Sequence, residues 1–282
     1  MRIRFWGVRG TIPTPGKETI KYGGNTACID ILTSDQHVII IDAGSGIRLL
    51  GQALVREHPR RVVGSILISH THWDHIQGFP FFAPVFGRNN RFVLIGQQRV
   101  DKHLEEVLAG QIVEPYLPFA YKTLPADLLV KEIEDGETIV VGEGTTVTAK
   151  RLNHPGGCLG FRIADRGAVF AYCTDTGHPD GTLVQSVLEL ADSADLLLHD
   201  AHFSSLSESR RYASWGHSCW QEAVQVALQA QVGALGLFHY APDLTDDDLE
   251  LIKEAARRTF PRTFLAREGM TVELPLQGDL PE

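Results

Sequence analysis

Apolar side chains recur along the chain in two spacings, which predict a mixture of strands and helices. Residues 2–6 alternate polar and apolar side chains, as a strand with one buried face does. Short apolar runs predict further strands at 27–32, 38–41, 65–69, 92–95, 146–152, 159–163, 168–173, 195–198 and 234–238. Helical spacing predicts helices at 47–56, 100–108, 183–190, 218–230 and 245–258. No repeat, low-complexity tract or linker interrupts this pattern, so residues 1–282 are expected to form a single domain.

One stretch concentrates polar residues directly after a buried apolar run: residues 70–75 read His-Thr-His-Trp-Asp-His. Side chains two apart on extended backbone point the same way, so His70 and His72 are expected to bind one metal ion. Asp74 and His75 fit the first turn of a helix, which should be short because two prolines follow closely, and would offer ligands to a second metal ion. Solvated or core histidines are the alternative, but charged groups are rarely buried unpaired, which favours a metal site.

A predicted hairpin brings two more candidate ligands together. Its arms are 159–163 and 168–173, joined by a turn at 165–167. A hairpin folds its two open ends side by side. His154 lies just before the first arm and Asp175 just after the second, so both are expected at one end of the sheet.

Two other polar residues follow buried strands. His239 comes at the end of the run 234–238 and is a further candidate ligand. Asp42 follows the run 38–41, where it either orients a metal-bound histidine or caps the helix 47–56. The sequence leaves both roles of Asp42 open.

A second polar region lies further along the chain. Residues 199–203 are followed by a polar loop that ends at His217, directly before a capping-box pattern at 218–221. The unpaired N–H groups at a helix N-terminus favour an anion, so His217 is a candidate substrate-binding residue. Capping of the helix is its alternative role.

The irregular stretch 110–126 carries aromatic residues and three prolines. It is either a lid or wall of the substrate site or a packed surface loop. His178 and His202 are weaker candidates for the pocket. The histidines in polar or helical contexts away from strand ends are expected at the surface: His37, His58 and His103.

Composition limits the partners. The chain of 282 residues has a net charge of −9, so it lacks the overall basic character of many nucleic-acid-binding proteins, and long nucleic acid is not expected as a partner. A small anionic substrate remains compatible, because a metal pair dominates the local field. No apolar run has transmembrane length, so a cytoplasmic location without membrane contact is expected; a homodimer is compatible. The four cysteines are scattered and are expected to be small buried side chains.

The order of the candidate ligands resembles the metallo-β-lactamase superfamily. A His-x-His-x-Asp-His cluster is followed by a single His, a single Asp and a single His, here at 154, 175 and 239. The resemblance covers nearly the whole chain and implies an α/β fold, a four-layer αβ/βα sandwich with a dinuclear metal site at one edge of its sheets. It also implies the ligands: His70, His72 and His154 for the first metal ion, Asp74, His75 and His239 for the second, and Asp175 bridging the two.

Other segments make the resemblance closest to the ribonuclease Z and cyclic-phosphodiesterase branch. That branch has a His-Glu-Ala-Thr-Phe-like segment and a later Gly-His-Ser/Met-Thr segment, where this chain has 199–203 and 216–219, with Asp200 in place of the Glu. True β-lactamases of the commonest type carry a Cys in place of Asp175. Oxygen-reducing di-iron members typically carry a Glu in place of His72. The inserted Gly/Pro/basic arm that grips tRNA is not found in this sequence.

The leading functional hypothesis is a dinuclear-metal hydrolase, a phosphodiesterase that acts on a small or cyclic phosphodiester through a metal-bridging hydroxide. Asp74 would accept a proton, His217 would contact a phosphate oxygen or the leaving alkoxide, and Asp200 would hold the other nitrogen of His217. The alternatives are an ester, thioester or lactone hydrolase with the same metal site, and a non-catalytic metal-binding sensor or interaction protein. Two divalent metal ions are the expected cofactors, zinc first, with manganese or iron as alternatives.

Overall fold

The computed structural model describes residues 1–98, 101–276 and 278, and its strands form two seven-stranded sheets. The first sheet contains, in spatial order, β14 (Thr271–Glu273), β1 (Arg2–Gly7), β2 (Cys28–Leu32), β3 (Val38–Ile41), β4 (Val63–Ile68), β5 (Arg91–Gln97) and β6 (Asp127–Ile133). The second contains β13 (Thr263–Leu265), β12 (Leu235–Phe238), β11 (Leu196–Asp200), β10 (Ala168–Cys173), β9 (Cys158–Asp165), β8 (Thr145–Leu152) and β7 (Thr138–Val141).

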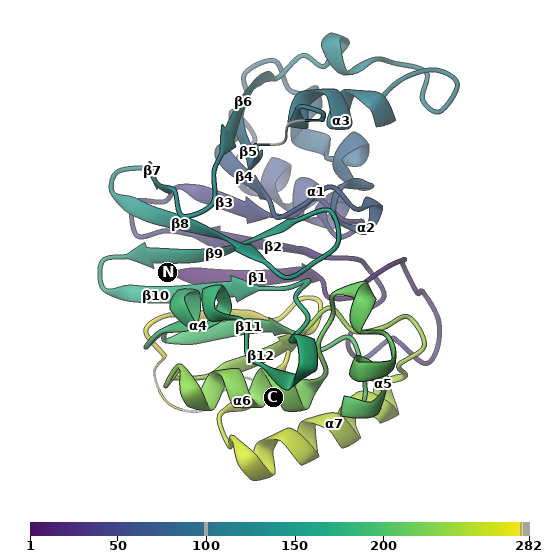
Figure 1. Ribbon diagram of the computed structural model, residues 1–282. Helices are drawn as coiled ribbons and strands as arrows, with labels where there is room; N and C mark the ends of the chain where they lie inside the picture. The colour runs from purple at the N-terminus through teal and green to yellow at the C-terminus, as the bar shows by residue number, and fades with distance from the viewer. Residues whose placement is uncertain (99–100, 277, 279–282) are drawn as a thin grey trace.

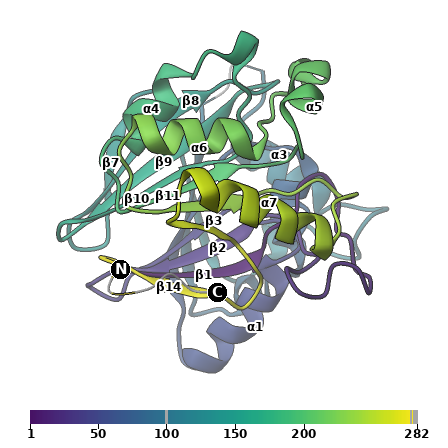
Figure 2. The same cartoon turned by 90° about the horizontal axis from the view of Figure 1, so that it is seen from below.

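The helices cover the outer faces of the two sheets. In chain order they are α1 (Ile47–Glu57), α2 (Trp73–Ile76), α3 (Leu104–Gln111), α4 (Gln185–Ala191), α5 (Leu206–Arg211), α6 (Trp220–Gln229) and α7 (Asp246–Thr259). Helix α1 packs on β1 and β2, whereas α4, α6 and α7 pack on strands of the second sheet (Figures 1 and 2). The predicted four-layer αβ/βα sandwich is confirmed.

Alternation of side chains along the strands builds the core between the sheets. In β1, Ile3 and Phe5 are buried while the residues on either side of them are partly exposed, as the alternating pattern predicts. These two side chains join Phe161 and Phe170 of the second sheet in one apolar cluster. A separate cluster lies between the first sheet and α1. All four cysteines are buried, as expected.

The topology brings the ends of several strands to the same edge. Strands β3 and β4 are parallel, as are β10, β11 and β12. The predicted hairpin is formed by β9 and β10, and its turn is Arg166–Gly167 because Asp165 already pairs with Ala168. The carboxyl ends of parallel strands are where open α/β sheets place their ligands.

Some elements differ from the predictions. Helix α3 begins at Leu104 rather than at residue 100, which lies outside the described residues. The stretch 110–126 contains the end of α3 and a short turn of 3₁₀ helix at Tyr121–Thr123. Strands β6, β7, β13 and β14 and helix α5 were not predicted, since they are very short or lie at sheet edges with a half-exposed pattern. Among the described residues, no helix combines the length and the apolar composition that crossing a membrane requires.

Candidate metal centre

Residues that follow strands supply most of the site. Asp175 comes two residues after β10 and His239 directly after β12. Both have left-handed backbone, with φ of 57° and 64°. Residues other than glycine rarely adopt this conformation, and such strain tends to collect at functional sites. The strained backbone therefore agrees with a functional role for these strand ends.

Three histidines form the first group of candidate ligands. His70 and His72 leave the end of β4, and His154 follows β8; their ligand atoms lie within 4.8 Å of one another. The Nε2 atom of His154 is 3.0 Å from Nδ1 of His72. The Nδ1 atom of His154 donates to the carbonyl oxygen of Gly216 at 2.9 Å, which leaves Nε2 toward the cluster.

The second group contains Asp74, His75 and His239, again with ligand atoms within 4.8 Å. The Nε2 atoms of His75 and His239 are 3.1 Å apart. Burial alone would lower the pKa of His75, but Asp175 and the other nearby carboxylates raise it well above its usual value. The carboxylates around His75 thus stabilise a positive charge at a buried position. Gly10 permits the close packing, because a Cβ there would lie 2.4 Å from the His239 ring.

Asp175 lies between the two groups and directs one oxygen toward each. Its Oδ1 is 3.9 Å from Nε2 of His70 and 3.8 Å from Nε2 of His154. Its Oδ2 is 3.2 Å from Nε2 of His75 and 3.5 Å from Nε2 of His239. The hairpin prediction that His154 and Asp175 meet at one end of the sheet is confirmed.

The pKa values of the first group of histidines and of Asp175 suit a metal site. Burial lowers the pKa of His70, His72 and His154, so these imidazoles are neutral, the form that binds a metal ion. Burial alone would raise the pKa of Asp175, but the surrounding imidazoles, His239 first, hold it well below its usual value. Neutral imidazoles around an ionised carboxylate are the donor set of zinc and similar divalent metals.

Buried polar atoms without a hydrogen-bond partner provide an independent test of whether these residues fit a metal ion. Nε2 of His70 and Oδ2 of Asp175 have no hydrogen-bond partner within the described part of the chain. Buried polar atoms without partners are rare in folded proteins. A divalent cation would satisfy both, so the residues present fit a divalent metal centre.

Asp42 is hydrogen-bonded to His75, one of the candidate ligands, without belonging to either ligand group. Its Oδ2 accepts hydrogen bonds from Nδ1 of His75 and from the hydroxyl of Tyr172, each at 2.8 Å. Ser69 donates to the same carboxylate through its backbone N–H and its hydroxyl. Helix α1 has Gly46 at its N-cap, so of the two roles left open for Asp42, capping is wrong and orientation of a histidine agrees with the contacts.

His217 and Asp200 lie beside the cluster. Nδ1 of His217 donates to Oδ2 of Asp200 at 2.8 Å and lies 3.8 Å from Oδ1 of Asp175. Burial alone would lower the pKa of His217 and raise that of Asp200. Their ion pair acts in the opposite direction: Asp200 raises the pKa of His217, and His217, with His239, lowers the pKa of Asp200 to about 2. The predicted cap at 218–221 is shifted: Cys219 is the N-cap of α6 and pairs with Glu222 in the capping box, so His217 does not cap the helix.

His202 is closer to the site than the sequence indicated. Its ring stacks on that of His217, with centroids 4.3 Å apart, and its ligand atoms group with those of His217 and His239. Its position two residues after Asp200 was the only signal in the sequence. His178 lines a separate pocket that also contains His217. Of the three histidines expected at the surface, His58 and His103 are exposed and His37 is half-buried.

An aromatic cleft adjoins the second group of ligands. Three exposed aromatic side chains line this cleft of about 740 Å³: Trp73, Phe81 and Tyr116. Thr11 also lines it and donates its backbone N–H to Oδ2 of Asp74 at 2.7 Å, which connects the cleft to the candidate metal centre. Because Tyr116 belongs to the stretch 110–126, this stretch forms a wall of the cleft. Trp73 was not singled out as a substrate contact from the sequence, although it lies within the ligand motif.

Two facing sheets covered by helices, with a His/Asp cluster at one edge, define a metallohydrolase of the metallo-β-lactamase fold. The profile of the beta-lactamase superfamily domain matches residues 37–240, and the chain belongs to this family. The predictions of this superfamily and of a metal-dependent hydrolase are confirmed.

Individual proteins give the same result. The chain is 22% identical to ribonuclease Z of Treponema denticola in an alignment that covers 86% of this chain and 91% of that protein. The metallo-beta-lactamase fold protein YhfI from Bacillus subtilis has a TM-score of 0.71 at 21% identity, with 96% of this chain and 97% of that chain covered. The short form of human tRNase Z has a TM-score of 0.69 at 18% identity, covering 98% and 100%. The predicted similarity to the ribonuclease Z branch is confirmed.

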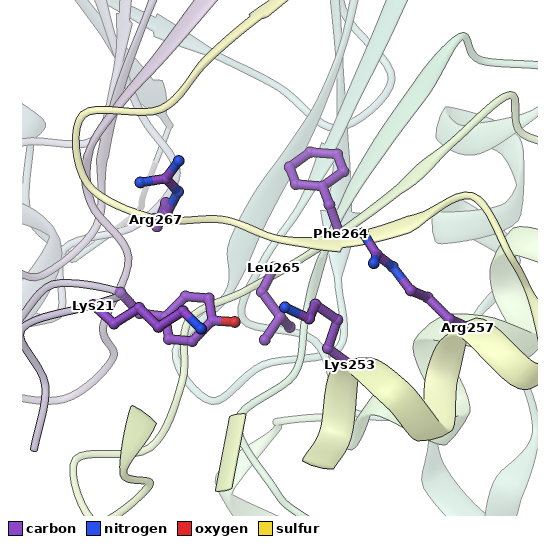
Figure 3. A pocket seen from close by; sticks show the side chains of 7 residues that line it. Lys21, Lys253, Arg257, Phe264, Leu265 and Arg267 are labelled. Atoms are coloured by element: carbon purple, nitrogen blue, oxygen red, sulfur yellow. The ribbon is translucent and has the colours of Figure 1, made fainter. Parts of the chain in front are cut away.

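The expectation that long nucleic acid is not a partner is wrong. Relatives aligned over most of their length carry the name ribonuclease Z, which denotes an RNA-cleaving enzyme. The expectation rested on the net charge of −9, but a net charge is a sum over the whole surface, whereas a phosphate responds to the charge nearby. Four cationic side chains line a single pocket (Figure 3): Lys21, Lys253, Arg257 and Arg267.

Proposed function

We propose that this chain is a phosphodiesterase with a dinuclear metal centre, with RNA as its substrate class and a small or cyclic phosphodiester as the alternative. The observation that carries the proposal is the position of Asp175, which directs one oxygen toward each group of ligands. The two groups assigned to the two metal ions, with Asp175 shared, are His70, His72 and His154, and Asp74, His75 and His239.

Zinc suits imidazole and carboxylate ligands, and manganese or iron is the alternative. When bound, such ions supply Lewis acidity that polarises the phosphodiester and lowers the pKa of water. Burial alone would raise the pKa of Asp74, but His75 and His239 hold it well below its usual value. Asp74 is assigned as a ligand of the second metal ion, and the role of proton acceptor that the sequence indicated belongs to the same proposal.

His217 is proposed to contact the phosphate group of the substrate. Asp200 fixes the proton of His217 at Nδ1, which leaves Nε2 for a non-bridging oxygen or for the leaving alkoxide. The side chain of His217 is 11% exposed, so it can reach a bound substrate while Asp200 is fully buried behind it. Because Asp200 raises the pKa of His217, the imidazole has a proton to donate over a wider pH range.

The aromatic cleft is assigned to the organic part of the substrate. Trp73 is 72% exposed and Tyr116 is 74% exposed, and both line the same cleft; exposed apolar side chains that gather in one patch are typical of interaction sites. Bases of RNA stack on exposed aromatic rings with little dependence on sequence. The cleft therefore favours a phosphodiester with at least one base next to the scissile bond.

Replacing Trp73 by Ala is expected to raise KM for a base-containing diester by about tenfold, the effect of removing one stacking interaction. Thymidine 5′-p-nitrophenyl phosphate would be compared with methyl p-nitrophenyl phosphate, which lacks a base and should be much less affected. Trp73→Phe keeps an aromatic ring and should restore most of the affinity. An equal rise in KM for both substrates would remove Trp73 from base recognition.

Parallel assays test the proposed function. The metal-loaded protein would be given bis(p-nitrophenyl) phosphate, a 2′,3′-cyclic nucleotide, a single-stranded RNA, a thioester and a lactone. Turnover of the phosphodiesters above that of the thioester and the lactone is expected, because Nε2 of His217 is proposed to contact a phosphate oxygen while Nδ1 donates to Asp200. Preference for the thioester or lactone would instead support the alternative function, an ester, thioester or lactone hydrolase. A protein inert to all five substrates would contradict the proposal.

A further inference from the structure

The basic pocket of about 400 Å³ is lined by seven residues: Lys21, Tyr22, Lys253, Arg257, Phe264, Leu265 and Arg267. Its cations come from three separate segments. Lys21 precedes β2, Lys253 and Arg257 lie one turn apart on α7, and Arg267 follows β13. Figure 3 shows Lys21 and Lys253 reaching toward each other across the pocket.

Three cations of the basic pocket, Lys21, Lys253 and Arg257, outnumber the carboxylates ion-paired with them among the described residues. Lys21 and Lys253 share one partner, Glu250, each at 2.6 Å. The hydroxyl of Tyr22 donates to the same carboxylate. Nε of Arg257 donates to the carbonyl oxygen of Thr263 at 2.7 Å, which fixes the guanidinium without neutralising it. Among the described residues, Glu250 is the only carboxylate ion-paired with Lys21, Lys253 or Arg257, so the pocket is positive.

The aromatic residues of the basic pocket are not available for stacking. Tyr22 is 3% exposed and Phe264 is 1% exposed. A ligand therefore meets charge and hydrogen-bond donors rather than an open ring. This chemistry suits phosphate groups irrespective of the bases attached to them.

The basic pocket is connected to the candidate metal centre by direct packing. The ring of Tyr22 lies 6.2 Å from that of Tyr240, the residue directly after His239. Strand β13, which contributes Phe264 and Leu265, is parallel to β12 and pairs with it up to Leu265. The pocket thus lies beside the strand end that carries His239.

We propose that the basic pocket binds backbone phosphates of an RNA chain whose scissile bond lies at the metal centre. The proposal rests on the proposed function, in which RNA is the substrate class. A small diester would fill the metal centre and the aromatic cleft alone, whereas a longer strand would also contact the pocket. The pocket would add affinity without adding sequence preference.

The salt dependence of RNA binding tests this proposal. The metal-loaded full chain would be titrated with a labelled 2′-O-methyl decauridylate from 50 to 200 mM salt, with the probe checked for cleavage afterwards. The slope of log K against log salt is negative, and removing one cation that binds a phosphate should reduce its magnitude by about 0.7. The double variant Lys253→Gln/Arg257→Gln should therefore lower the magnitude of the slope by about 1.4. Its KM for RNA should rise more than its KM for bis(p-nitrophenyl) phosphate.

The matched control removes two cations elsewhere. Arg60 and Arg61 are exposed and lie before β4, at the end of the strand opposite to His70. Arg60→Gln/Arg61→Gln should keep the slope of the unmodified chain. Should the α7 double variant fold poorly, Lys21→Gln replaces a loop residue whose side chain is 55% exposed and should lower the magnitude of the slope by about 0.7.

Two outcomes would overturn the inference: an unchanged slope in the pocket variants, or the same decrease in the Arg60/Arg61 control. The proposed function fails differently, by absence of diester turnover in the unmodified chain. Failure of the pocket and failure of the metal centre are therefore measured separately.

Discussion

Replacing Asp175 by Asn is expected to abolish phosphodiester turnover and to reduce bound metal from about two ions per chain to one or fewer. The physical reason is the position of the carboxylate: each oxygen faces one group of imidazoles, at 3.2 to 3.9 Å from the nearest nitrogens. An amide keeps the shape but removes the charge that the two cations would share. Metal content would be measured by mass spectrometry of the purified protein, and turnover with bis(p-nitrophenyl) phosphate.

Asp192→Asn serves as the control for Asp175, since Asp192 is an exposed carboxylate in the same half of the chain. It should retain metal and turnover. An Asp175→Asn variant that keeps two ions and its activity would contradict the assignment of Asp175 as the shared ligand.

Replacing His217 by Ala is expected to leave the metal content intact while lowering turnover by roughly two to four orders of magnitude, the usual scale of general acid–base catalysis. His217 is not among the residues assigned to the two metal ions, and its Nδ1 donates to Asp200, so its loss is expected to remove a proton donor rather than a proposed ligand. The effect should fall on kcat more than on KM, because a donor to the leaving group acts mainly in the transition state.

His103→Ala is a suitable control for His217, because His103 is exposed at the start of α3. Its turnover should match that of the unmodified chain. Unchanged turnover in His217→Ala would remove His217 from the mechanism, and loss of metal would show instead that it supports the ligands.

Much of the fold and the meeting of the candidate ligands could be predicted from the sequence, because the ligands lie at strand ends. The alternation in β1 and the hairpin of β9 and β10 depend on local spacing alone. A hairpin then fixes which residues meet, which is why His154 and Asp175 could be brought together although they are distant in sequence. Order and spacing of the ligands therefore carried three-dimensional information.

Other features depend on contacts that spacing does not encode. The cap of α6 shifted by one residue because Ser218 donates its hydroxyl to Thr176 instead of capping the helix. The position of His202 against His217 depends on the packing of two loops. The basic pocket combines residues 21–22 with residues between 253 and 267, which are far apart in sequence, so a net charge of −9 could not reveal it. Local charge follows from the fold and not from composition.

The aromatic cleft and the basic pocket assign different parts of an RNA substrate to different surfaces. The cleft, with Trp73 and Tyr116, would take bases next to the scissile bond. The pocket, with Lys253 and Arg257, would take backbone phosphates further along the strand. Variants in the cleft should distinguish substrates with and without bases, whereas variants in the pocket should distinguish long from short substrates.

The most direct measurement for the dinuclear assignment is anomalous diffraction at the zinc edge from crystals of the zinc-loaded protein. Two peaks are expected, each about 2.0–2.2 Å from its ligand atoms. One should lie among His70, His72 and His154, the other among Asp74, His75 and His239, with Asp175 contacting both. A single peak, or peaks that Asp175 does not bridge, would contradict the dinuclear centre.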